Sequence, residues 1–324
     1  MTTPNDSFAT ALAEPFSGLD GDIFHAQRFS RGKVRDIVDL GDRLALVTTD
    51  RISAFDRVLG AFPYRGQVLN QLAAWWFNNS SDIVGSHVLD VPDPNITVGA
   101  KCRPLPVEVV VRARMSGSTS TALWTHYAAG QRVIYGHRFP DRLTKNVALE
   151  RPVITPTTKA TDGGHDEPIT EAQIVEGGLV DRSLWDQVRE IALAVFERGQ
   201  RVAEGAGLIL VDTKYEFGLT QKDELVIIDE VHTPDSSRYW RSSSSDALIE
   251  AGREPENMDK EVLRLAYRRL GYRGEGDPPA LTEELARDLA TVYLEVFDCL
   301  TGRPLRRAVY PIDDRVEKAV ETLL

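Results

Sequence analysis

The stretch at 208–238 constrains the fold most, because two apolar runs in it flank a short polar segment. The first run is L-I-L-V at 208–211 and the second is V-I-I at 226–228. Apolar, β-branched runs on either side of a turn-forming segment are typical of a β-hairpin. We therefore predict a hairpin whose loop is T-Q-K-D-E at 220–224.

The predicted hairpin carries charged side chains, which are costly to bury without a partner or a ligand. Side chains alternate along a strand, so Asp212, Lys214 and Glu216 project from one face. The second strand delivers Asp229 near the level of Glu216, but whether both share a face depends on a one-residue choice of register that the sequence leaves open. Two converging carboxylates would bind a hard divalent cation, with Lys214 as counter-charge or phosphate ligand. A solvated hairpin with a salt bridge is the alternative.

A basic segment with one glycine, R-G-K-V-R, lies earlier in the chain at 31–35. Gly32 would let the backbone approach a phosphate while Lys33 and Arg35 supply positive charge. One glycine at a turn is by itself a weak signal. The segment is neither a Walker loop nor a dinucleotide fingerprint, since both need more glycines at set spacing.

Arginine and hydroxyl side chains gather in a third segment, where Arg112 and Arg114 precede S-G-S-T-S-T at 116–121. Guanidinium and hydroxyl donors together can form a cradle for an oxyanion. A helix predicted to follow could direct its N-terminus at a phosphate, although helix capping by one hydroxyl would explain the pattern as well. Lys159 lies in a long loop predicted at 152–168, where it would bind a nucleotide phosphate or a substrate carboxylate.

These segments resemble the phosphoribosylaminoimidazole-succinocarboxamide synthase (SAICAR synthetase) family of purine biosynthesis. The resemblance covers about residues 29–240 and, more loosely, the helical part to 302. The blocks that carry it stand in the family's order: R-G-K-V-R-D-I-V at 31–38, T-D-R-I-S-A-F-D at 49–56, P-T-T-K-A-T-D-G-G-H-D-E at 156–167, and D-T-K-Y-E-F-G at 212–218 with I-D-E-V-H-T-P-D-S-S-R-Y-W at 228–240.

The resemblance implies an ATP-dependent ligase that joins carboxyaminoimidazole ribotide (CAIR) and L-aspartate, with release of ADP and phosphate. A carboxylate has a poor leaving group, so the γ-phosphoryl group of ATP would first convert it to an acyl phosphate. The protein would then supply position and charge rather than covalent chemistry. Mg²⁺ bound by Glu216 and Asp229 would bridge phosphate oxygens. No residue stands out as the base for the aspartate amine.

Roles for individual residues also come from the resemblance. The residues expected to be catalytic are Lys214, Glu216 and Asp229. The residues expected to bind ATP are Gly32, Lys33, Val34, Arg35, Lys159 and Lys214. The residues expected to bind the substrate are Glu108, Arg112, Ser118, Asp212, Asp235 and Arg238. The hydroxyl residues at 119–121 receive no role.

Composition excludes several classes of protein. The chain has 38 Lys and Arg against 49 Asp and Glu, a net charge of −11, which gives no general attraction to nucleic acid or anionic membranes. Its two cysteines, Cys102 and Cys299, lie far apart without metal-ligand spacing. The first residues lack a signal-peptide pattern, and no apolar stretch approaches membrane-spanning length. We expect a cytoplasmic enzyme that is a monomer or small homo-oligomer.

The expected fold class is α+β with two lobes, as in SAICAR synthase and related to ATP-grasp and kinase folds. A β-rich nucleotide-binding lobe would precede a larger α/β lobe with C-terminal helices. The expected boundaries are a loosely attached polar arm at 1–20, the ATP-binding lobe at 21–106, the substrate- and metal-binding lobe at 107–240, and a helical extension that packs on the second lobe at 241–324.

Periodicity and turn residues predict the local elements. Helices are predicted at 67–79, after a Thr170–Gln173 capping box, at 183–204, at 260–270 and at 283–300. The predicted buried stripe of the 183–204 helix is Leu184, Val188, Ile191, Val195 and Val202. A hairpin is predicted around Gly41 and a buried strand at 106–112. Loops are predicted at 49–56 and 90–95, and a flexible polar segment at 241–246.

Two other functions share parts of these patterns. A small-molecule kinase with a similar ATP site would place a base near its acceptor hydroxyl. A nucleotide-sensing module with a degraded site is disfavoured, because the metal carboxylates and the phosphate-binding lysines are all present. ADP release that requires both L-aspartate and the ribotide would separate the ligase from both alternatives.

Overall fold

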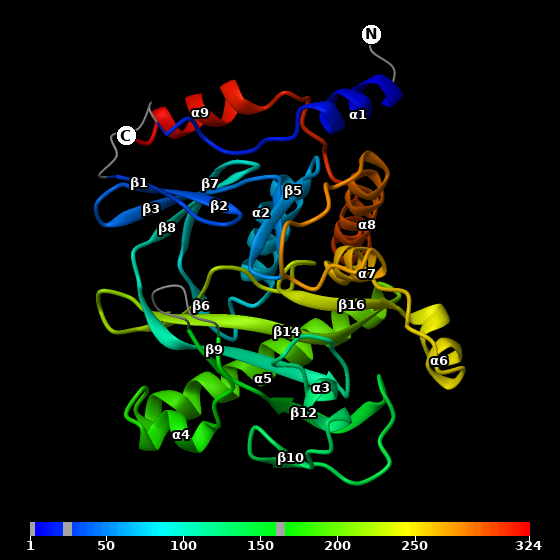
Figure 1. Ribbon diagram of the computed structural model, residues 1–324. Helices are drawn as coiled ribbons and strands as arrows, with labels where there is room; N and C mark the ends of the chain where they lie inside the picture. The colour runs from blue at the N-terminus through cyan, green and yellow to red at the C-terminus, as the bar shows by residue number, and fades with distance from the viewer. Residues whose placement is uncertain (1–3, 22–27, 160–165) are drawn as a thin grey trace.

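The computed structural model describes residues 4–21, 28–159 and 166–324, and its fold is α+β as predicted (Figure 1). The helices are α1 Pro4–Ala13, α2 Arg65–Asn79, α3 Leu123–Ala128, α4 Glu171–Glu176, α5 Arg182–Gly205, α6 Ser242–Glu250, α7 Glu261–Arg269, α8 Glu283–Thr301 and α9 Asp313–Glu321. The strands are β1 Phe29–Arg31, β2 Arg35–Asp39, β3 Arg43–Thr48, β4 Arg51–Ala54, β5 Arg57–Ala61, β6 Gly85–Ser86, β7 Val88–Asp93, β8 Ile96–Ala100, β9 Arg103–Arg114, β10 Val133–Ile134, β11 His137–Arg138, β12 Ala148–Ile154, β13 Thr157–Thr158, β14 Leu208–Leu219, β15 Leu225–Ile228 and β16 Ser237–Arg241.

The first sheet has the strand order β1-β2-β3-β8-β7, with antiparallel neighbours throughout. The predicted hairpin around Gly41 is confirmed as β2 and β3, and Gly41 adopts φ +98°, which suits glycine. Helix α2 packs on this sheet and buries Leu69, Leu72 and Trp76.

The second sheet is built around β14, which pairs with β9 on one side and with β15 and β16 on the other. The predicted hairpin is confirmed as β14 and β15 with its loop at 220–224. Glu216 pairs with Ile228, so Asp229 lies one residue beyond the strand, where its φ of +67° marks a sharp turn. Helix α5 packs behind β14 (Figure 1).

Four segments predicted to lack regular structure contain strands or a helix instead. Residues 49–56 contain β4, whose hairpin with β5 turns at Phe55 and Asp56, both with positive φ. Residues 90–95 begin within β7, an edge strand, where a proline removes no ladder hydrogen bond. The serine-rich run at 241–246 starts α6, and the Ser245 hydroxyl donates to the Arg241 carbonyl one turn back at 2.7 Å. Within the predicted loop 152–168, β13 forms at 157–158, and residues 160–165 lie outside the described part.

The buried face of α5 is shifted from the predicted stripe. Leu184, Ile191 and Val202 are only half-buried. The buried residues are Trp185, Val188, Ala192, Val195, Phe196, Gly199 and Ala203. A pattern of large aliphatic residues misses this face because most of its buried residues are aromatic or small. A Cβ on Gly199 would lie 2.1 Å from His232 Cε1, so no larger residue fits there.

The N-terminal arm is more firmly attached than predicted. Phe16 and Leu19 are buried, and their backbone amides donate to Asp50 Oδ2 at 2.9 Å and to Asp36 Oδ2 at 2.8 Å. Asp36 and Asp50 belong to the first lobe, so these hydrogen bonds attach the arm to that lobe at Phe16 and Leu19.

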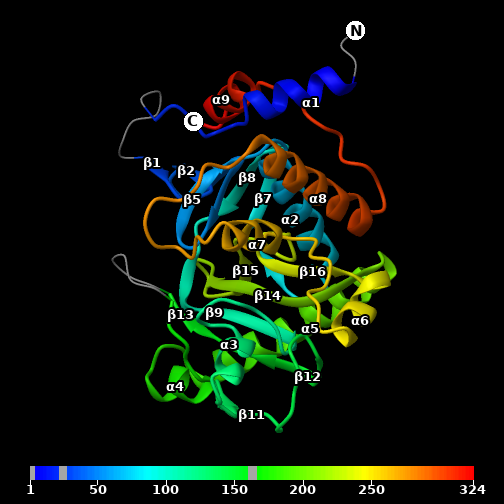
Figure 2. The same ribbon diagram turned by 45° about the vertical axis from the view of Figure 1, so that its right-hand side comes forward.

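The C-terminal helices also depart from the prediction that they pack on the second lobe. Helix α8 contacts α2 and α1 as well as α7, and α9 contacts β7. Figures 1 and 2 show α1, α8 and α9 gathered around the first sheet. In the segment at 302–312, here called the C-terminal strap, the Tyr310 hydroxyl donates to Asp50 Oδ2 at 2.7 Å. Helices α8 and α9 and the strap therefore complete the first lobe, whereas α6 contacts β16 of the second sheet.

The two lobes share strands. The predicted boundary at 106/107 falls inside β9, and β6 from the first lobe pairs with β15 of the second sheet. The remaining domain boundaries stay predictions. None of the helices in the described ranges combines the length and apolarity needed to cross a membrane.

Candidate functional site

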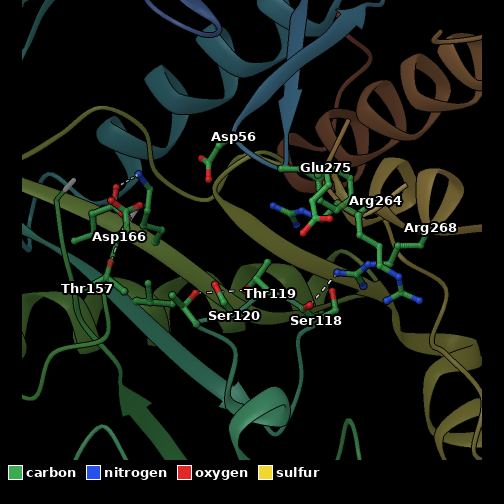
Figure 3. A pocket seen from close by; sticks show the side chains of 16 residues that line it. Asp56, Ser118, Thr119, Ser120, Thr157, Asp166, Arg264, Arg268 and Glu275 are labelled. Carbon is green, nitrogen blue, oxygen red and sulfur yellow. Dashed lines mark hydrogen bonds and ion pairs between the residues drawn. The ribbon is translucent and has the colours of Figure 1, made fainter. Parts of the chain in front are cut away.

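A pocket of about 790 Å³ opens between the two lobes, and Figure 3 shows most of the polar side chains around it. Its walls come from β9 and β14, the 118–121 segment, the β4–β5 turn, and α7 with the loop that follows it. The residues that line it are Phe55, Asp56, Glu108, Val110, Ser118, Thr119, Ser120, Thr121, Thr157, Asp166, Lys214, Arg264, Arg268, Arg273, Gly274 and Glu275.

At one end of the pocket, the lining residues Glu108 and Lys214 are joined by ion pairs to Glu216 and Lys159, which are not among the described lining residues. Glu216 on β14 lies opposite Glu108 on β9, and the Lys214 ammonium donates to Glu108 Oε1 at 2.6 Å and to Glu216 Oε1 at 2.7 Å. The Lys159 ammonium pairs with the other oxygen of Glu216. Burial would raise the pKa of Glu216, but the positive charges of Lys214 and Lys159 outweigh it and hold that pKa at about 2. These contacts bring together Glu108, Lys159, Lys214 and Glu216, and the binding roles predicted for them stay predictions.

Asp229 lies in a second, adjoining group of charges. The Arg35 guanidinium pairs with Asp229 and, at 3.4 Å, with Glu230. Burial would lower the pKa of Arg35, but these two carboxylates outweigh it and raise that pKa. Asp229 also raises the pKa of Lys214, although burial opposes the rise, so the two groups of charges are electrostatically joined.

The glycine segment forms a tight turn between β1 and β2. The Gly32 amide donates to the Arg35 carbonyl at 2.8 Å, and a Cβ on Gly32 would lie 2.9 Å from that oxygen. Lys33 pairs with Asp56 of the β4–β5 turn at 2.9 Å. The carbonyl of Val34 accepts from the Thr49 hydroxyl at 2.8 Å. Lys33 thereby contacts a residue that lines the pocket, whereas none of Gly32, Lys33, Val34 and Arg35 is among the described residues that line it.

The opposite end of the pocket is basic. The Ser118 hydroxyl donates to Glu261 Oε1 at 2.7 Å, and Arg264 and Arg268 contact the same carboxylate at 3.1 and 3.6 Å. In Figure 3, Arg264 and Arg268 lie beside Ser118. Burial would raise the pKa of Glu261, but Arg238 and Arg264 outweigh it and hold that pKa at about 2. Ser118 was predicted from the sequence, whereas the two arginines were not, although their spacing of four residues puts them on one helix face.

Three predicted substrate-binding residues form a buried cluster behind the pocket wall. Arg112 donates to Asp212 Oδ2 at 3.1 Å and to the Thr155 hydroxyl at 2.8 Å. Arg238 lies 3.7 Å from the same Asp212 oxygen and donates to the Ser116 hydroxyl at 2.8 Å. None of the three is among the described residues that line the main pocket.

Asp235 is held away from the pocket wall. Its Oδ2 accepts from Arg65 at 2.7 Å and pairs with Lys260 at 2.6 Å, and its Oδ1 accepts from the Tyr293 hydroxyl at 2.7 Å. Burial would raise the pKa of Asp235, but Arg65 and Lys260 lower it. Both carboxylate oxygens already accept from the protein, so the predicted role of Asp235 in binding the substrate receives no support from these contacts.

Carboxylate side chains near the pocket offer the type of ligand atom that Mg²⁺ binds. Glu216, Asp229 and Glu230 offer carboxylate oxygens, the hard ligands that Mg²⁺ prefers. Across residues 4–21, 28–159 and 166–324, no three His, Cys, Asp or Glu side chains lie close enough together to hold an ion by themselves. A magnesium ion bound here would therefore need further oxygens, which water and nucleotide phosphates supply.

Known proteins match this chain closely. Residues 28–279 match the family described as SAICAR synthetase. A phosphoribosylaminoimidazole-succinocarboxamide synthase of Legionella pneumophila (strain Lens) is 50% identical over 293 residues, which are 88% of this chain and 92% of that protein. The chloroplastic synthase of Arabidopsis thaliana is 44% identical over 98% of this chain and 77% of that protein. The solved structure of the SAICAR synthase from Saccharomyces cerevisiae complexed with SAICAR gives a TM-score of 0.73 at 29% identity, covering 86% of this chain and 95% of that one.

A second solved structure supports the fold alone. It is a SAICAR synthetase (type 2) in complex with ADP, and it gives a TM-score of 0.65 at 23% identity, covering 86% of this chain and 99% of that one.

Proposed function

The chain belongs to the SAICAR synthetase family of purine-biosynthesis ligases, and from this premise we propose that it joins CAIR and L-aspartate, with conversion of ATP to ADP and phosphate. The observation that carries the proposal is the division of one pocket into two ends. Lys214 and its carboxylates form one end, and Ser118 with Arg264 and Arg268 forms the other. A nucleotide and an anionic ribotide could therefore meet in it.

The lysine and carboxylate end suits the reacting phosphates. We place the triphosphate of ATP near the Gly32 turn, where Lys33, Arg35, Lys159 and Lys214 are available to neutralise it. The type 2 SAICAR synthetase of similar fold was solved in complex with ADP, in line with a nucleotide in this pocket. Glu216 and Asp229 would hold Mg²⁺, which, when bound, would spread the charge of the transferring phosphoryl group.

The basic end suits the phosphate of the ribotide. Two guanidinium groups and a hydroxyl make a cradle whose donors are aimed at one carboxylate, that of Glu261. Each guanidinium has five N–H donors, and Glu261 holds the two groups in position, so their remaining donors would bind the phosphate. The buried Arg112–Asp212–Arg238 cluster would position this wall through Ser116.

The proposed reaction has two steps. An oxygen of the ribotide carboxylate attacks the γ-phosphorus, and the bond from that phosphorus to the ADP oxygen breaks. The aspartate amine then attacks the carboxyl carbon, loses a proton, and expels inorganic phosphate. Lys159 and Lys214 would stabilise the charge on the transferring group, and a pocket that holds both reactants would supply orientation.

An isotope experiment tests this reaction directly. Label (¹⁸O) in the ribotide carboxylate should appear in released phosphate, one atom per turnover, because that oxygen bonds to phosphorus before its bond to carbon breaks. ADP release should require both the ribotide and L-aspartate, with aspartate incorporated into the product. Mass spectrometry of the phosphate measures the transfer. Normal amide formation with unlabelled phosphate would exclude the acyl phosphate, and a stable phosphorylated product would indicate a kinase.

Arg264→Gln should raise the KM for the ribotide about ten- to hundredfold, because it removes one charged hydrogen-bond donor from the cradle. The KM for ATP should change little, since Arg264 lies at the other end of the pocket. Steady-state kinetics with each substrate varied in turn measure both constants. Arg269→Gln, an exposed arginine on the same helix, is the matched control. Equal weakening of ribotide and ATP would contradict the assignment of this end.

A further inference from the structure

Each proposed metal ligand already has a cationic partner. Arg35 pairs with Asp229 and Glu230, and Lys159 pairs with Glu216 from another part of the chain. The Arg35 and Asp229 side chains are 15% and 28% exposed, so solvent screens this pair only in part. Lys214 pairs with the other oxygen of Glu216 and also with Glu108. A metal ion that takes one paired oxygen each from Asp229 and Glu216 must therefore displace Arg35 and a lysine, and we assign this lysine as Lys159 because Lys214 also pairs with Glu108.

Displacement by the metal alone is unfavourable. The freed guanidinium and ammonium groups would lose their carboxylate partners while remaining partly buried. In the described part of the chain, the metal would also find no cluster of three protein ligands to compensate. Nucleotide phosphates remove both costs, because their oxygens can bind the metal and can also accept from the freed cations.

Arg35 is well placed for such an exchange. Its carbonyl accepts from the Gly32 amide, so the guanidinium belongs to the same turn that the proposed function places against the phosphates. Its Nε makes a long 3.4 Å contact to the Thr48 hydroxyl, a weak restraint beside the two ion pairs. A side-chain rotation can therefore carry the charge from Asp229 to a nearby phosphate without moving β2.

We propose that Arg35 and Lys159 occupy the metal carboxylates until a nucleotide arrives, so that divalent metal and nucleoside diphosphate or triphosphate bind cooperatively by an exchange of ionic partners. The metal takes the carboxylates, and the two cations take phosphate oxygens. This inference rests on the nucleotide site of the proposed function. By linkage, the nucleotide must strengthen metal binding by the same factor as the metal strengthens nucleotide binding.

The test measures Mn²⁺ binding to the full chain by electron paramagnetic resonance, with and without ADP. Arg35→Met should bind Mn²⁺ without nucleotide at least tenfold more tightly than wild type, because the competing cation is gone. It should bind ADP more weakly, and the factor by which ADP strengthens Mn²⁺ binding should fall at least tenfold. Lys159→Met, which frees an oxygen of Glu216, should likewise tighten Mn²⁺ binding without nucleotide and weaken ADP binding. Tighter Mn²⁺ binding together with weaker ADP binding distinguishes an exchange from damage to the site, which would weaken the binding of both.

Arg103→Met is the matched control. Arg103 pairs with Asp223 in the loop of the same hairpin, and the two side chains are 69% and 79% exposed. The Arg103→Met substitution removes one positive charge, as Arg35→Met does, but away from the pocket. The Mn²⁺ and ADP affinities of this control variant should therefore equal those of wild type.

Unchanged or weaker Mn²⁺ binding in the variants without nucleotide would overturn the exchange. If Arg35→Met fails to fold, Lys159→Met decides by the same criterion. A wild-type chain that lacks ligase turnover but binds Mn²⁺ and ADP cooperatively through Arg35 would refute the proposed function and support the exchange. Ligase turnover together with independent binding of Mn²⁺ and ADP would support the proposed function and refute the exchange.

Discussion

Glu216→Gln and Asp229→Asn should each lower Mg²⁺-dependent turnover about a hundred- to thousandfold, the scale of losing one electrostatic contact to a transition state. Each change removes one negative charge while keeping the size and an oxygen acceptor of the side chain. Glu216 would keep a hydrogen bond from Lys214 or Lys159 as the amide, so the hairpin should fold normally. The initial rate of ADP release, with both co-substrates saturating, measures the loss.

Glu224→Gln is the matched control for this prediction, because Glu224 is exposed in the loop of the same hairpin. Circular dichroism melting would verify that all three variants fold. Near-normal turnover in folded Glu216→Gln or Asp229→Asn at ordinary Mg²⁺ would remove that residue from the proposed metal site.

The largest expected loss of stability comes from Arg65→Met. The Arg65 side chain is completely buried, and it donates to the Thr49 carbonyl at 2.9 Å and to Asp235 Oδ2 at 2.7 Å. Removing one partner from a buried ion pair costs about 3–5 kcal/mol in the free energy of unfolding, because the other charge stays buried. Lys260 still faces Asp235 and should limit the loss to the lower part of that range. Urea unfolding followed by tryptophan fluorescence measures it.

Arg43→Met supplies the comparison, since Arg43 pairs with Asp42 on the surface of the same lobe. Arg43→Met should lower the free energy of unfolding by no more than about 0.5 kcal/mol, as most surface substitutions do. A similarly small loss for Arg65→Met would show that the Arg65–Asp235 pair contributes little to joining α2 to the loop before β16.

The parts of the site that the sequence could predict lie within single local segments. Lys214 and Glu216 alternate on one strand, and Lys33 and Arg35 flank one turn, so a short pattern together with the family resemblance identifies them. The relation of Glu216 to Asp229 needed the register of β14 and β15, because a shift of one residue turns each side chain to the other face.

Arg264 and Arg268 show why the rest of the site could not be predicted. Arginines one turn apart on an amphipathic helix are typical of a solvent-exposed face. Their function depends on α7 packing across from Ser118, which is 143 residues from its partner Glu261 along the chain. The same limit applies to Arg112, which pattern alone places at a ligand but which the fold buries against Asp212. In both cases, contacts between segments far apart in the sequence decide whether the arginine faces the pocket or is buried.

The packing of α8 and the C-terminal strap also sets the order in which the chain can fold during synthesis. Phe62 packs edge-on against Tyr293 with ring centroids 5.0 Å apart, and Tyr64 packs in the same way against Tyr310 at 5.1 Å. When a ribosome has made the first sheet and α2, these aromatic partners have not yet been translated. The core of the first lobe therefore closes only after α8 and the strap have emerged, and until then the lobe exposes apolar surface that favours aggregation.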